Sequence, residues 1–365
     1  MTYIENQNIL LISPEAWGQN FVSKHHYAIE LSNKNMVYFL NPPSAGFQTK
    51  KINDQLITVD YSPLFKGLRK LPTFLNQWLI KKEIQHLEKK LHTTFDVIWN
   101  FDSSRFFNLN LFSNKLKICH IVDMAENIQR NLLAQTSDIC FCTSDFIVKE
   151  LNPFNQNVHK INHGYHSNAE YYDIEEGFNS NIQVGYVGNL SRKAIDWPNI
   201  FSIIENHPNC EFNFIGNYKK SNLSDQNLNS ETLDRLNSFK NVQLLGPKNS
   251  QLIPSYLKKF DILLCAYKIE NKEDVQQHSN LHKTMEYLGS GKVIVSSYSD
   301  EYKNNKELLE MAMPNEDIVI KFEQVVNNIT LYNSQEKQKE RITFALSNSY
   351  KNQLKKINLI LKKIT

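Results

Sequence analysis

The residues with the clearest potential for chemistry are Lys283 and Glu286, which lie three positions apart near the start of a predicted helix. Ser279 and Asn280 are favourable N-cap residues, and Leu281–Leu288 carries apolar side chains at helical spacing. Such a pair projects from one face of the helix, whose free amides and positive dipole end attract a phosphate. The pattern indicates a nucleotide site, with Lys283 on a diphosphate and Glu286 accepting hydrogen bonds from ribose hydroxyls. From spacing alone, a surface helix with an ordinary ion pair between the two is the favoured alternative.

The pattern N-x-x-K-x-x-E-Y-L-x-x-G-K-V-I-V, which runs from Asn280 to Val295, resembles the C-terminal-domain signature of GT-B glycosyltransferases of the large group 1 class. In that family the glutamate holds the ribose of a nucleotide sugar and the basic residues face its diphosphate, which implies these roles for Glu286 and Lys283. Many retaining members carry another glutamate eight positions earlier, where this chain has His278. We include His278 and Asn280 among the substrate-binding candidates, and the resemblance leaves the stereochemical outcome open.

A glycine-containing loop follows the strand that opens the second half of the chain. Gly188 lets the backbone approach a diphosphate, Asn189 adjoins it, and Arg192 supplies a bidentate fork. A glycine after a strand is most often only a turn. The loop nevertheless resembles the first loop of the family's C-terminal domain, where a basic residue meets the donor phosphates, and Lys193 competes with Arg192 for that role. Lys248 lies in a further loop, at the position where the family reads the base.

Two groups of candidates lie in the first half of the chain. Gly18, Lys24 and His25 belong to the loop after the first strand and the next helix start, where the resemblance implies contact with donor phosphate or acceptor; an idle, partly exposed histidine is the alternative. His120 and Asp123 end a later strand, and this H-x-x-D pattern resembles teichuronic-acid-type relatives. Inverting transfer needs a base near the acceptor hydroxyl, which suits a carboxylate or an imidazole, whereas retaining transfer can use the donor phosphate. Capping of the following helix by Asp123 is the alternative.

The elements that position these residues follow a regular order. Strand-like apolar runs alternate with helical segments almost throughout, beginning with Asn8–Ser13 and a helix over Ser23–Ser32. This rhythm predicts parallel sheets covered on both faces, with ligands bound beyond the carboxyl ends of the strands. A polar, acidic segment at 167–181 interrupts the rhythm and indicates a linker.

The predicted architecture is therefore α/β with two domains, residues 1–166 and residues 182–334. The resemblance implies a GT-B fold, in which two doubly wound, Rossmann-like domains face one another. The N-terminal domain would bind the acceptor and the C-terminal domain the nucleotide-sugar donor. Residues 335–365 are predicted as a Lys-rich helix that crosses back onto the N-terminal domain.

Composition excludes several classes. A length of 365 residues suits two domains of roughly 150–180 residues each. The net charge of +3 is too small to indicate nucleic-acid binding. Five cysteines without C-x-x-C spacing indicate buried thiols in a reducing compartment. No run is long and apolar enough to span a membrane, and the N-terminus lacks a secretory pattern, so we expect a cytoplasmic protein.

The stretch Leu64–Ile84 suggests contact with the cytoplasmic face of the inner membrane. Basic and aromatic residues on an amphipathic helix suit an anionic membrane surface, and a helix that packs its apolar face on the sheet is the equal alternative. The basic residues are Lys66, Arg69, Lys70, Lys81 and Lys82, interleaved with Phe65, Phe74 and Trp78.

Missing motifs narrow the chemistry further. The chain has no D-x-D clasp, so we expect no essential metal and no cofactor beyond the nucleotide diphosphate sugar as substrate. It also lacks G-x-G-x-x-G after the first strand, a P-loop and a G-x-S-x-G elbow. We predict a metal-independent glycosyltransferase of the hexosyltransferase type, with a saccharide or lipid-linked acceptor, in bacterial surface polysaccharide synthesis. The alternatives are a nucleotide-sugar epimerase-type enzyme on the same fold and a non-catalytic nucleotide-sugar-binding protein.

Overall fold

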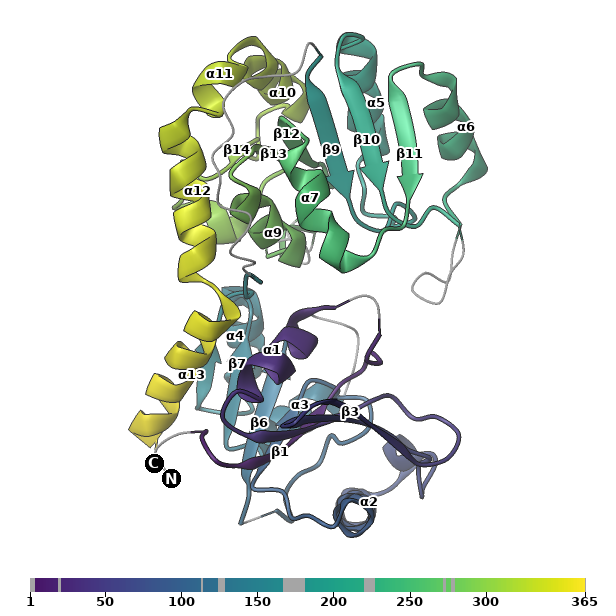
Figure 1. Ribbon diagram of the computed structural model, residues 1–365, viewed down its shortest axis with the longest axis vertical. Coiled ribbons are helices and arrows are strands. Elements are labelled where there is room, and N and C mark those ends of the chain that lie inside the picture. Colours follow the sequence, from purple (N-terminus) through teal and green to yellow (C-terminus); the bar gives the residue numbers. More distant parts are fainter. Residues whose placement is uncertain are drawn as a thin grey trace. The chain divides into compact units, whose positions relative to one another are not determined.

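The computed structural model describes residues 4–18, 21–112, 114–123, 129–166, 181–219, 227–271, 274–276 and 280–364. The chain forms two compact units (Figure 1). Unit 1 comprises Met1–His163 and Tyr350–Thr365, and unit 2 comprises Gly164–Ser349. The predicted linker at 167–181 lies outside the described residues except for its last position.

Unit 1 contains an eight-stranded sheet in the described part of the chain, in the order β3-β4-β2-β1-β5-β6-β7-β8. All neighbouring strands are parallel except β3 and β4, which form an antiparallel edge. Every residue of the inner strands β5 and β7 is buried, as expected where helices cover both faces, whereas the edge strand β3 is mostly exposed. The strands are β1 Asn8–Ile12, β2 Met36–Leu40, β3 Gln48–Asn53, β4 Leu56–Asp60, β5 Val97–Asn100, β6 Leu116–Ile121, β7 Ile139–Cys142 and β8 Val158–Lys160.

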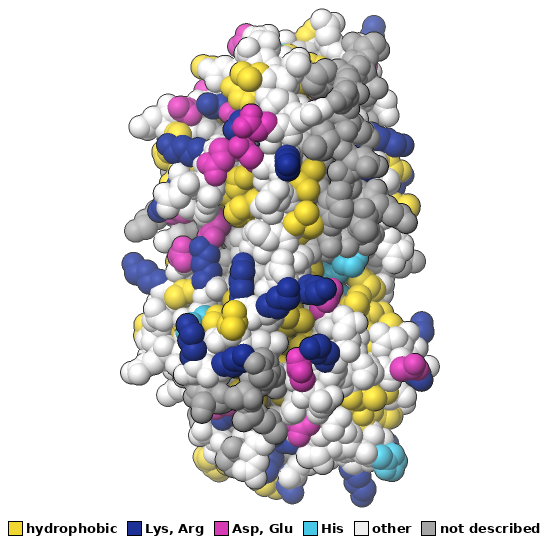
Figure 2. All heavy atoms as spheres, turned by 60° about the vertical axis from the view of Figure 1, so that its left-hand side comes forward, with side chains coloured by type: hydrophobic (Ala, Val, Ile, Leu, Met, Phe, Trp, Pro, Cys, Tyr) yellow, Lys and Arg dark blue, Asp and Glu magenta, His cyan; other side chains and the backbone are white. Residues whose placement is uncertain are grey.

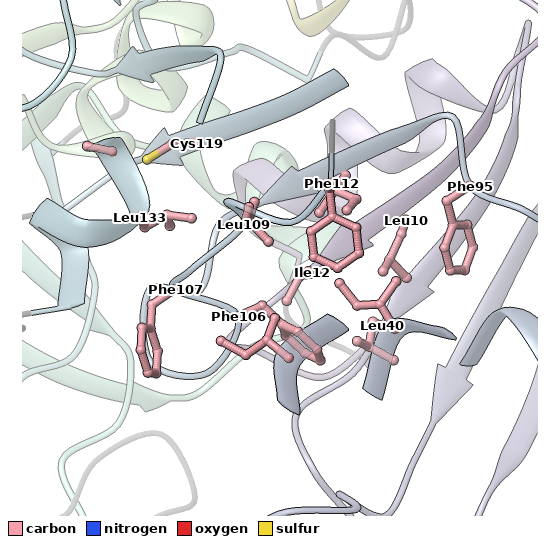
Figure 3. Close-up of a cluster of buried hydrophobic side chains, with 14 of the residues drawn as sticks. Leu10, Ile12, Leu40, Phe95, Phe106, Phe107, Leu109, Phe112, Cys119 and Leu133 are labelled. Atoms are coloured by element: carbon pink, nitrogen blue, oxygen red, sulfur yellow. The ribbon is translucent and has the colours of Figure 1, made fainter. Parts of the chain in front are cut away.

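Two apolar clusters lie on opposite faces of this sheet, because successive side chains of a strand point to opposite sides. Leu10 and Ile12 of β1 belong to one cluster, which also holds Phe95 and Phe106 (Figure 3). Ile9 and Leu11 belong to the other. The helices are α1 Ser23–Leu31, η1 Leu68–Lys70, α2 Thr73–Leu91, α3 Gln129–Thr136, α4 Asp145–Leu151 and α13 Tyr350–Ile364.

The C-terminal segment forms two helices rather than the single predicted one. Helix α12, Gln335–Ser347, belongs to unit 2, whereas α13 belongs to unit 1. The ring of Tyr350 stacks on His26 of α1 at 4.8 Å, and the Asn358 side chain accepts a hydrogen bond from the Ile4 amide at 3.3 Å. The predicted return of the chain onto its N-terminal part is therefore confirmed for α13. Figure 2 shows a face on which Lys and Arg side chains lie together with Asp and Glu side chains. Helix α13 carries exposed lysines and no acidic residue.

Unit 2 contains a six-stranded parallel sheet in its described residues, in the order β11-β10-β9-β12-β13-β14. The order reverses between β9 and β12, and such a switch point opens a crevice at the carboxyl ends of the strands. The strands are β9 Gln183–Val187, β10 Glu211–Ile215, β11 Val242–Gly246, β12 Ile262–Cys265, β13 Val293–Ser296 and β14 Glu310–Met311. The helices are α5 Trp197–Asn206, α6 Ser230–Ser238, η3 Ser250–Leu252, α7 Ile253–Lys258, α9 His282–Ser290, η4 Asp300–Tyr302, α10 Ile318–Asn327, α11 Ile329–Tyr332 and α12.

A buried arginine fixes the turn that follows α9. Arg341 of α12 is fully buried, and its guanidinium donates to the carbonyl oxygens of Gly291 at 3.0 Å, Tyr332 at 2.9 Å and Leu308 at 3.4 Å. These bonds satisfy a charge that would otherwise be costly to bury. They tie α12 to the end of α9, the helix that carries the predicted nucleotide residues. Among the described residues, no helix is long and apolar enough to cross a membrane.

Candidate functional site

The carboxyl ends of β9 and β10 approach each other closely. The Gly188 amide donates to the Ile215 carbonyl at 2.9 Å, and the Leu190 amide donates to the Asn217 carbonyl at 2.9 Å. A side-chain carbon on Gly216 would lie 1.7 Å from the carbonyl oxygen of Gly188, so this contact requires glycine. Gly188 and Gly216 have φ values of +152° and +149°, a region open to glycine. Backbone hydrogen bonds to the loop after β10 therefore hold the loop after β9 in place at the switch point of the sheet.

Helix α9 begins later than the sequence predicts. Its N-cap is Leu281, which has extended backbone angles and no side-chain cap, so the predicted cap at Ser279 or Asn280 is wrong. Leu281 packs against the apolar cluster beside α5, and this burial decides where the helix starts. Asn280 lies one position before the cap and is buried. His278 lies outside the described residues.

The C-terminal part of α9 contains two glycines with different roles. Gly289 does not stop the helix but lies within it, where a side-chain carbon would come within 2.2 Å of the Tyr165 ring. The helix ends at Gly291, which adopts the left-handed conformation with φ +77°. Glycine at position 289 thus serves close packing, and Gly291 makes the turn into β13.

Lys283 lies among aromatic rings rather than beside a carboxylate. Its ammonium nitrogen is 3.8 Å from the ring centroid of Tyr186, 4.8 Å from that of Tyr267 and 5.7 Å from that of Tyr287. The nitrogen is buried and has no hydrogen-bond partner. Lys283 and Glu286 form no ion pair, although both are described, so the simple alternative drawn from their spacing is wrong.

Glu286 keeps its carboxylate available. Its side chain is 35% exposed, and its Oε1 lies 3.7 Å from Nδ1 of His282, one turn earlier on α9. The following residue anchors the helix: the Tyr287 hydroxyl accepts from the Val187 amide at 2.7 Å, at the end of β9. The Glu286 carboxylate therefore projects from a helix that is fixed to the switch point.

The remaining candidates of unit 2 lie in the loops that follow β9 and β11, at the carboxyl ends of these strands. The Asn189 side chain accepts from the Ser191 amide at 2.9 Å and shapes the loop, and the exposed Arg192 lies 5.9 Å from the Tyr267 ring. Lys248 follows β11 and lies 5.8 Å from the ring of Tyr256. A cavity of about 640 Å³ borders the loop; its lining includes Arg192, Lys193, Trp197, Arg235 and Lys268.

In unit 1, the predicted helix over Ser23–Ser32 is confirmed as α1, but its polar residues serve the local fold. Lys24 pairs with Glu15 of the preceding loop and is buried. The His25 Nδ1 accepts from the Val22 amide at 3.1 Å, and its Nε2 lies 3.1 Å from the Ala16 carbonyl. Burial lowers the pKa of His25. These contacts hold the loop before α1, in which Gly18 is exposed.

His120 and Asp123 have opposite environments. The His120 imidazole is 1% exposed, its Nδ1 accepts from the Trp99 indole at 3.3 Å, and its ring stacks on Phe101 at 4.5 Å. Burial lowers the pKa of His120 to about 3, so the ring is neutral at physiological pH and does not reach solvent. Asp123 is exposed two positions beyond β6. Residues 124–128, where a helix capped by Asp123 would begin, lie outside the described part of the chain.

The sequence interpretation missed the three tyrosines around Lys283. Tyr186 stands in the strand before Gly188, Tyr287 directly follows Glu286, and Tyr267 lies two positions after β12. Their types and positions in the chain gave no signal that the rings converge. In the described residues, no cluster of three or more His, Cys, Asp or Glu side chains has the arrangement of a metal site.

Comparison with protein-family models and with curated protein sequences finds no match. Solved structures are similar over nearly the whole chain. Sucrose-phosphate synthase from Thermosynechococcus elongatus has a TM-score of 0.68 at 11% identity, covering 98% of this chain and 99% of that chain. The catalytic domain of starch synthase IV from Arabidopsis thaliana, bound to ADP and acarbose, has a TM-score of 0.68 at 9% identity, with 99% of each chain covered. Anabaena HepE, in complex with UDP and glucose, has a TM-score of 0.67 at 12% identity, covering 96% and 98%. Together with the two parallel-sheet units, these similarities show that the chain has the α/β GT-B fold.

Proposed function

We propose that this protein is a glycosyltransferase that moves a sugar from a nucleotide diphosphate sugar to a saccharide or lipid-linked acceptor. The observation that carries the proposal is the position of Glu286. Its accessible carboxylate projects from a helix anchored by Tyr287 to the end of β9, beside the Gly188 loop at the switch point of the sheet. Proteins of similar structure have been solved with UDP and with ADP.

In the proposed donor site, Glu286 accepts hydrogen bonds from ribose hydroxyls. The backbone at Gly188 and Asn189 and the guanidinium of Arg192 face the diphosphate, because amides at a glycine turn and a planar cation both suit phosphate oxygens. Lys248 lies near the base. Asn280 and His278 are proposed on the sugar side, following the order of the motif.

For the transfer step we propose Asp123 as the base on unit 1. Its carboxylate accepts the proton of the acceptor hydroxyl, the hydroxyl oxygen attacks the anomeric carbon, and the bond from that carbon to the diphosphate oxygen breaks. The nucleoside diphosphate leaves with the bonding electron pair. The buried, neutral His120 suits a positioning role in β6 better than the predicted role as an acid–base group. Gly18 lies in the loop before α1, and Lys24 and His25 at the start of α1 contact that loop, which we propose shapes this part of unit 1.

Calorimetric titration with UDP, GDP, ADP and CMP, without added metal, tests the donor site. The Glu286→Gln variant should weaken binding about 10- to 100-fold, because a hydrogen bond to a charged group contributes about 1.5–3 kcal/mol. Glu323→Gln, which changes an exposed glutamate on α10 of the same unit, is the matched control and should bind as the unchanged protein does. Absence of binding by any nucleotide at millimolar concentration, or unaltered binding by Glu286→Gln, would reject the site.

Turnover separates a transferase from the two alternative functions. A transferase releases free nucleoside diphosphate only when a suitable acceptor is present. An epimerase-type enzyme changes the sugar of the donor without an acceptor, and a binding protein releases nothing. A panel of saccharide and lipid-linked acceptors with each donor that binds therefore decides among the three, and bacterial surface polysaccharide synthesis is the pathway that we propose.

We also propose that unit 1 contacts the cytoplasmic face of an anionic membrane through α2. Phe74 is 69% exposed and Trp78, one turn later, is 48% exposed, although the opposite side of α2 packs on the core. The Lys82 ammonium lies 5.7 Å from the Trp78 ring and extends the same stripe. Residues 61–82 contain no acidic side chain. Exposed aromatic rings beside lysines and arginines fit the boundary between headgroups and acyl chains.

Sedimentation with vesicles tests this surface. The protein should bind vesicles that contain phosphatidylglycerol, and binding should fall in high salt and in the double variant Phe74→Ser/Trp78→Ser. The control is Leu331→Ser, which removes an apolar side chain that is 67% exposed on unit 2. Equal binding to neutral vesicles, or binding unchanged by the double variant, would contradict the proposal.

A further inference from the structure

The ammonium group of Lys283 is buried without a hydrogen-bond acceptor. Within the described part of the chain, its nitrogen has no hydrogen-bond partner and no carboxylate forms an ion pair with it. A Lys ammonium carries three N–H donors, and burial of such a group without acceptors is unfavourable. The attraction of the tyrosine rings offsets part of this cost. The three donors of Lys283 therefore lack oxygen acceptors in this position, and the ammonium would gain them by moving to a partner that offers oxygen atoms.

The surroundings of this nitrogen are aromatic and neutral. The rings of Tyr186, Tyr267 and Tyr287 are each less than 5% exposed, and the Tyr186 and Tyr267 hydroxyls lie 3.3 Å apart. Burial raises the pKa of the Cys265 thiol, and the charge of Lys283 opposes that rise, which places a neutral thiol near the cation. We call Tyr186, Tyr267 and Tyr287 the tyrosine cage. Among the described residues, the cation is thus surrounded by aromatic rings and a thiol rather than by a carboxylate.

The location of the caged cation connects it to the donor site. Lys283 is the second residue of α9, Glu286 lies three positions later on that helix, and Tyr186 belongs to β9 just before the Gly188 loop. The lysine side chain has four methylene groups and can move its charge by several ångströms without a change in the helix. A diphosphate at the Gly188 loop would give its ammonium the charged oxygen acceptors that the cage lacks.

We infer that the tyrosine cage is a storage position for the Lys283 ammonium and that the donor diphosphate draws the ammonium out of it. This inference rests on the proposed function and adds a specificity role for three tyrosines. The caged nitrogen is buried, so a phosphate oxygen cannot contact it in that position. The cage and the diphosphate therefore compete for one cation, and the apparent affinity depends on how often the lysine leaves the cage. A nucleoside without phosphate does not enter this competition.

The cage can be weakened without removing the cation. Tyr186→Leu deletes the nearest aromatic face, whereas Tyr186→Phe keeps the face and loses only the hydroxyl. Weakening the cage should favour the released lysine and tighten binding of a diphosphate. Removing the cation with Lys283→Met should weaken diphosphate binding. The two changes therefore act in opposite directions only if the cage stores the cation.

The experiment compares UDP with uridine and ADP with adenosine by calorimetry. We expect Lys283→Met to weaken binding of the diphosphate at least 10-fold and Tyr186→Leu to tighten it several-fold, while Tyr186→Phe and all nucleoside affinities change less than 2-fold. Tyr267→Leu replaces Tyr186→Leu if that variant does not fold. Weaker diphosphate binding in both cage variants would show that the cage holds Lys283 in its active position, and would overturn the inference.

A direct measurement on the lysine provides the second test. Ring currents from the tyrosines should shift the ε-methylene proton signals of Lys283 upfield, and Lys283→Met assigns them by their loss. Saturation with the diphosphate should return these signals to ordinary lysine values. Signals that stay upfield in a protein saturated with diphosphate would overturn the storage role while leaving the Glu286 site intact. Absence of any nucleotide binding, by contrast, would reject the proposed function itself.

Discussion

Replacement of His120 by glutamine should make unit 1 less sensitive to acid. In the folded chain, burial lowers the pKa of His120 from 6.5 to about 3. In the unfolded chain the imidazole titrates near its ordinary value. Between these values the unfolded state binds a proton that the folded state does not, so stability is complete above pH 6.5 and falls as the pH is lowered towards 3. Glutamine keeps an acceptor for the Trp99 indole but does not titrate.

The size of the effect follows from the pKa difference. Lowering the pH from 6.5 to 5.0 covers roughly 1.5 units at about 1.36 kcal/mol each, which gives a loss of about 2 kcal/mol from this histidine. The loss should be present in the unchanged chain and absent in His120→Gln. Other buried histidines, such as His25, contribute equally to both chains and cancel in the difference.

Urea unfolding at pH 7.5 and pH 5.0 measures this difference. Trp197 is the one tryptophan of unit 2, so a Trp197→Phe background leaves the fluorescence of Trp17, Trp78 and Trp99 to report on unit 1. Equal pH dependence in the two chains would refute the reasoning. If His120→Gln instead kept its stability but lost most of its kcat, with a pH profile centred near 6.5, His120 would be an acid–base group after all.

Two further predictions concern the elements that hold the donor site. Arg341→Met should lower the free energy of unfolding of unit 2 by about 3 kcal/mol or more, because three carbonyl groups lose a charged donor. The control Lys339→Met, on the exposed side of α12, should change this free energy by less than about 0.5 kcal/mol in thermal or urea unfolding. Gly216→Ala should separate the loops after β9 and β10 and abolish nucleotide binding, because its new carbon would collide with the Gly188 carbonyl. In the control Gly246→Ala, the new carbon meets no atom within 4 Å. This control should show only backbone strain of about 1–3 kcal/mol and near-normal binding in the calorimetric titration.

The alternation of strands and helices was readable from the sequence because buried parallel strands are short apolar runs with turn residues between them. The apolar run Asn8–Ser13 became strand β1, and the predicted helix at Ser23 was correct to within one residue. The GT-B fold followed from this order together with the motif around Glu286. These are local properties, since each depends on the spacing of apolar residues along a single element.

The site itself depended on contacts that spacing does not encode. Leu281 took the N-cap position because its side chain packs on the core, although two better capping residues precede it. His120 shares a sheet face with Ile118, and only the helices above that face make it a buried position.

Lys283 shows most clearly that the contacts of a charged group depend on the tertiary structure. Its spacing from Glu286 predicted an ion pair or a shared ligand, both of which are properties of one helix. The tyrosine rings come from β9, from the segment after β12 and from α9, which are brought together only by the strand order β10-β9-β12. The sequence by itself determined which residues carry charge and which helix they occupy. The partner of that charge was decided by the tertiary structure, because ring faces attract a cation only where the folded sheet places them within a few ångströms of it.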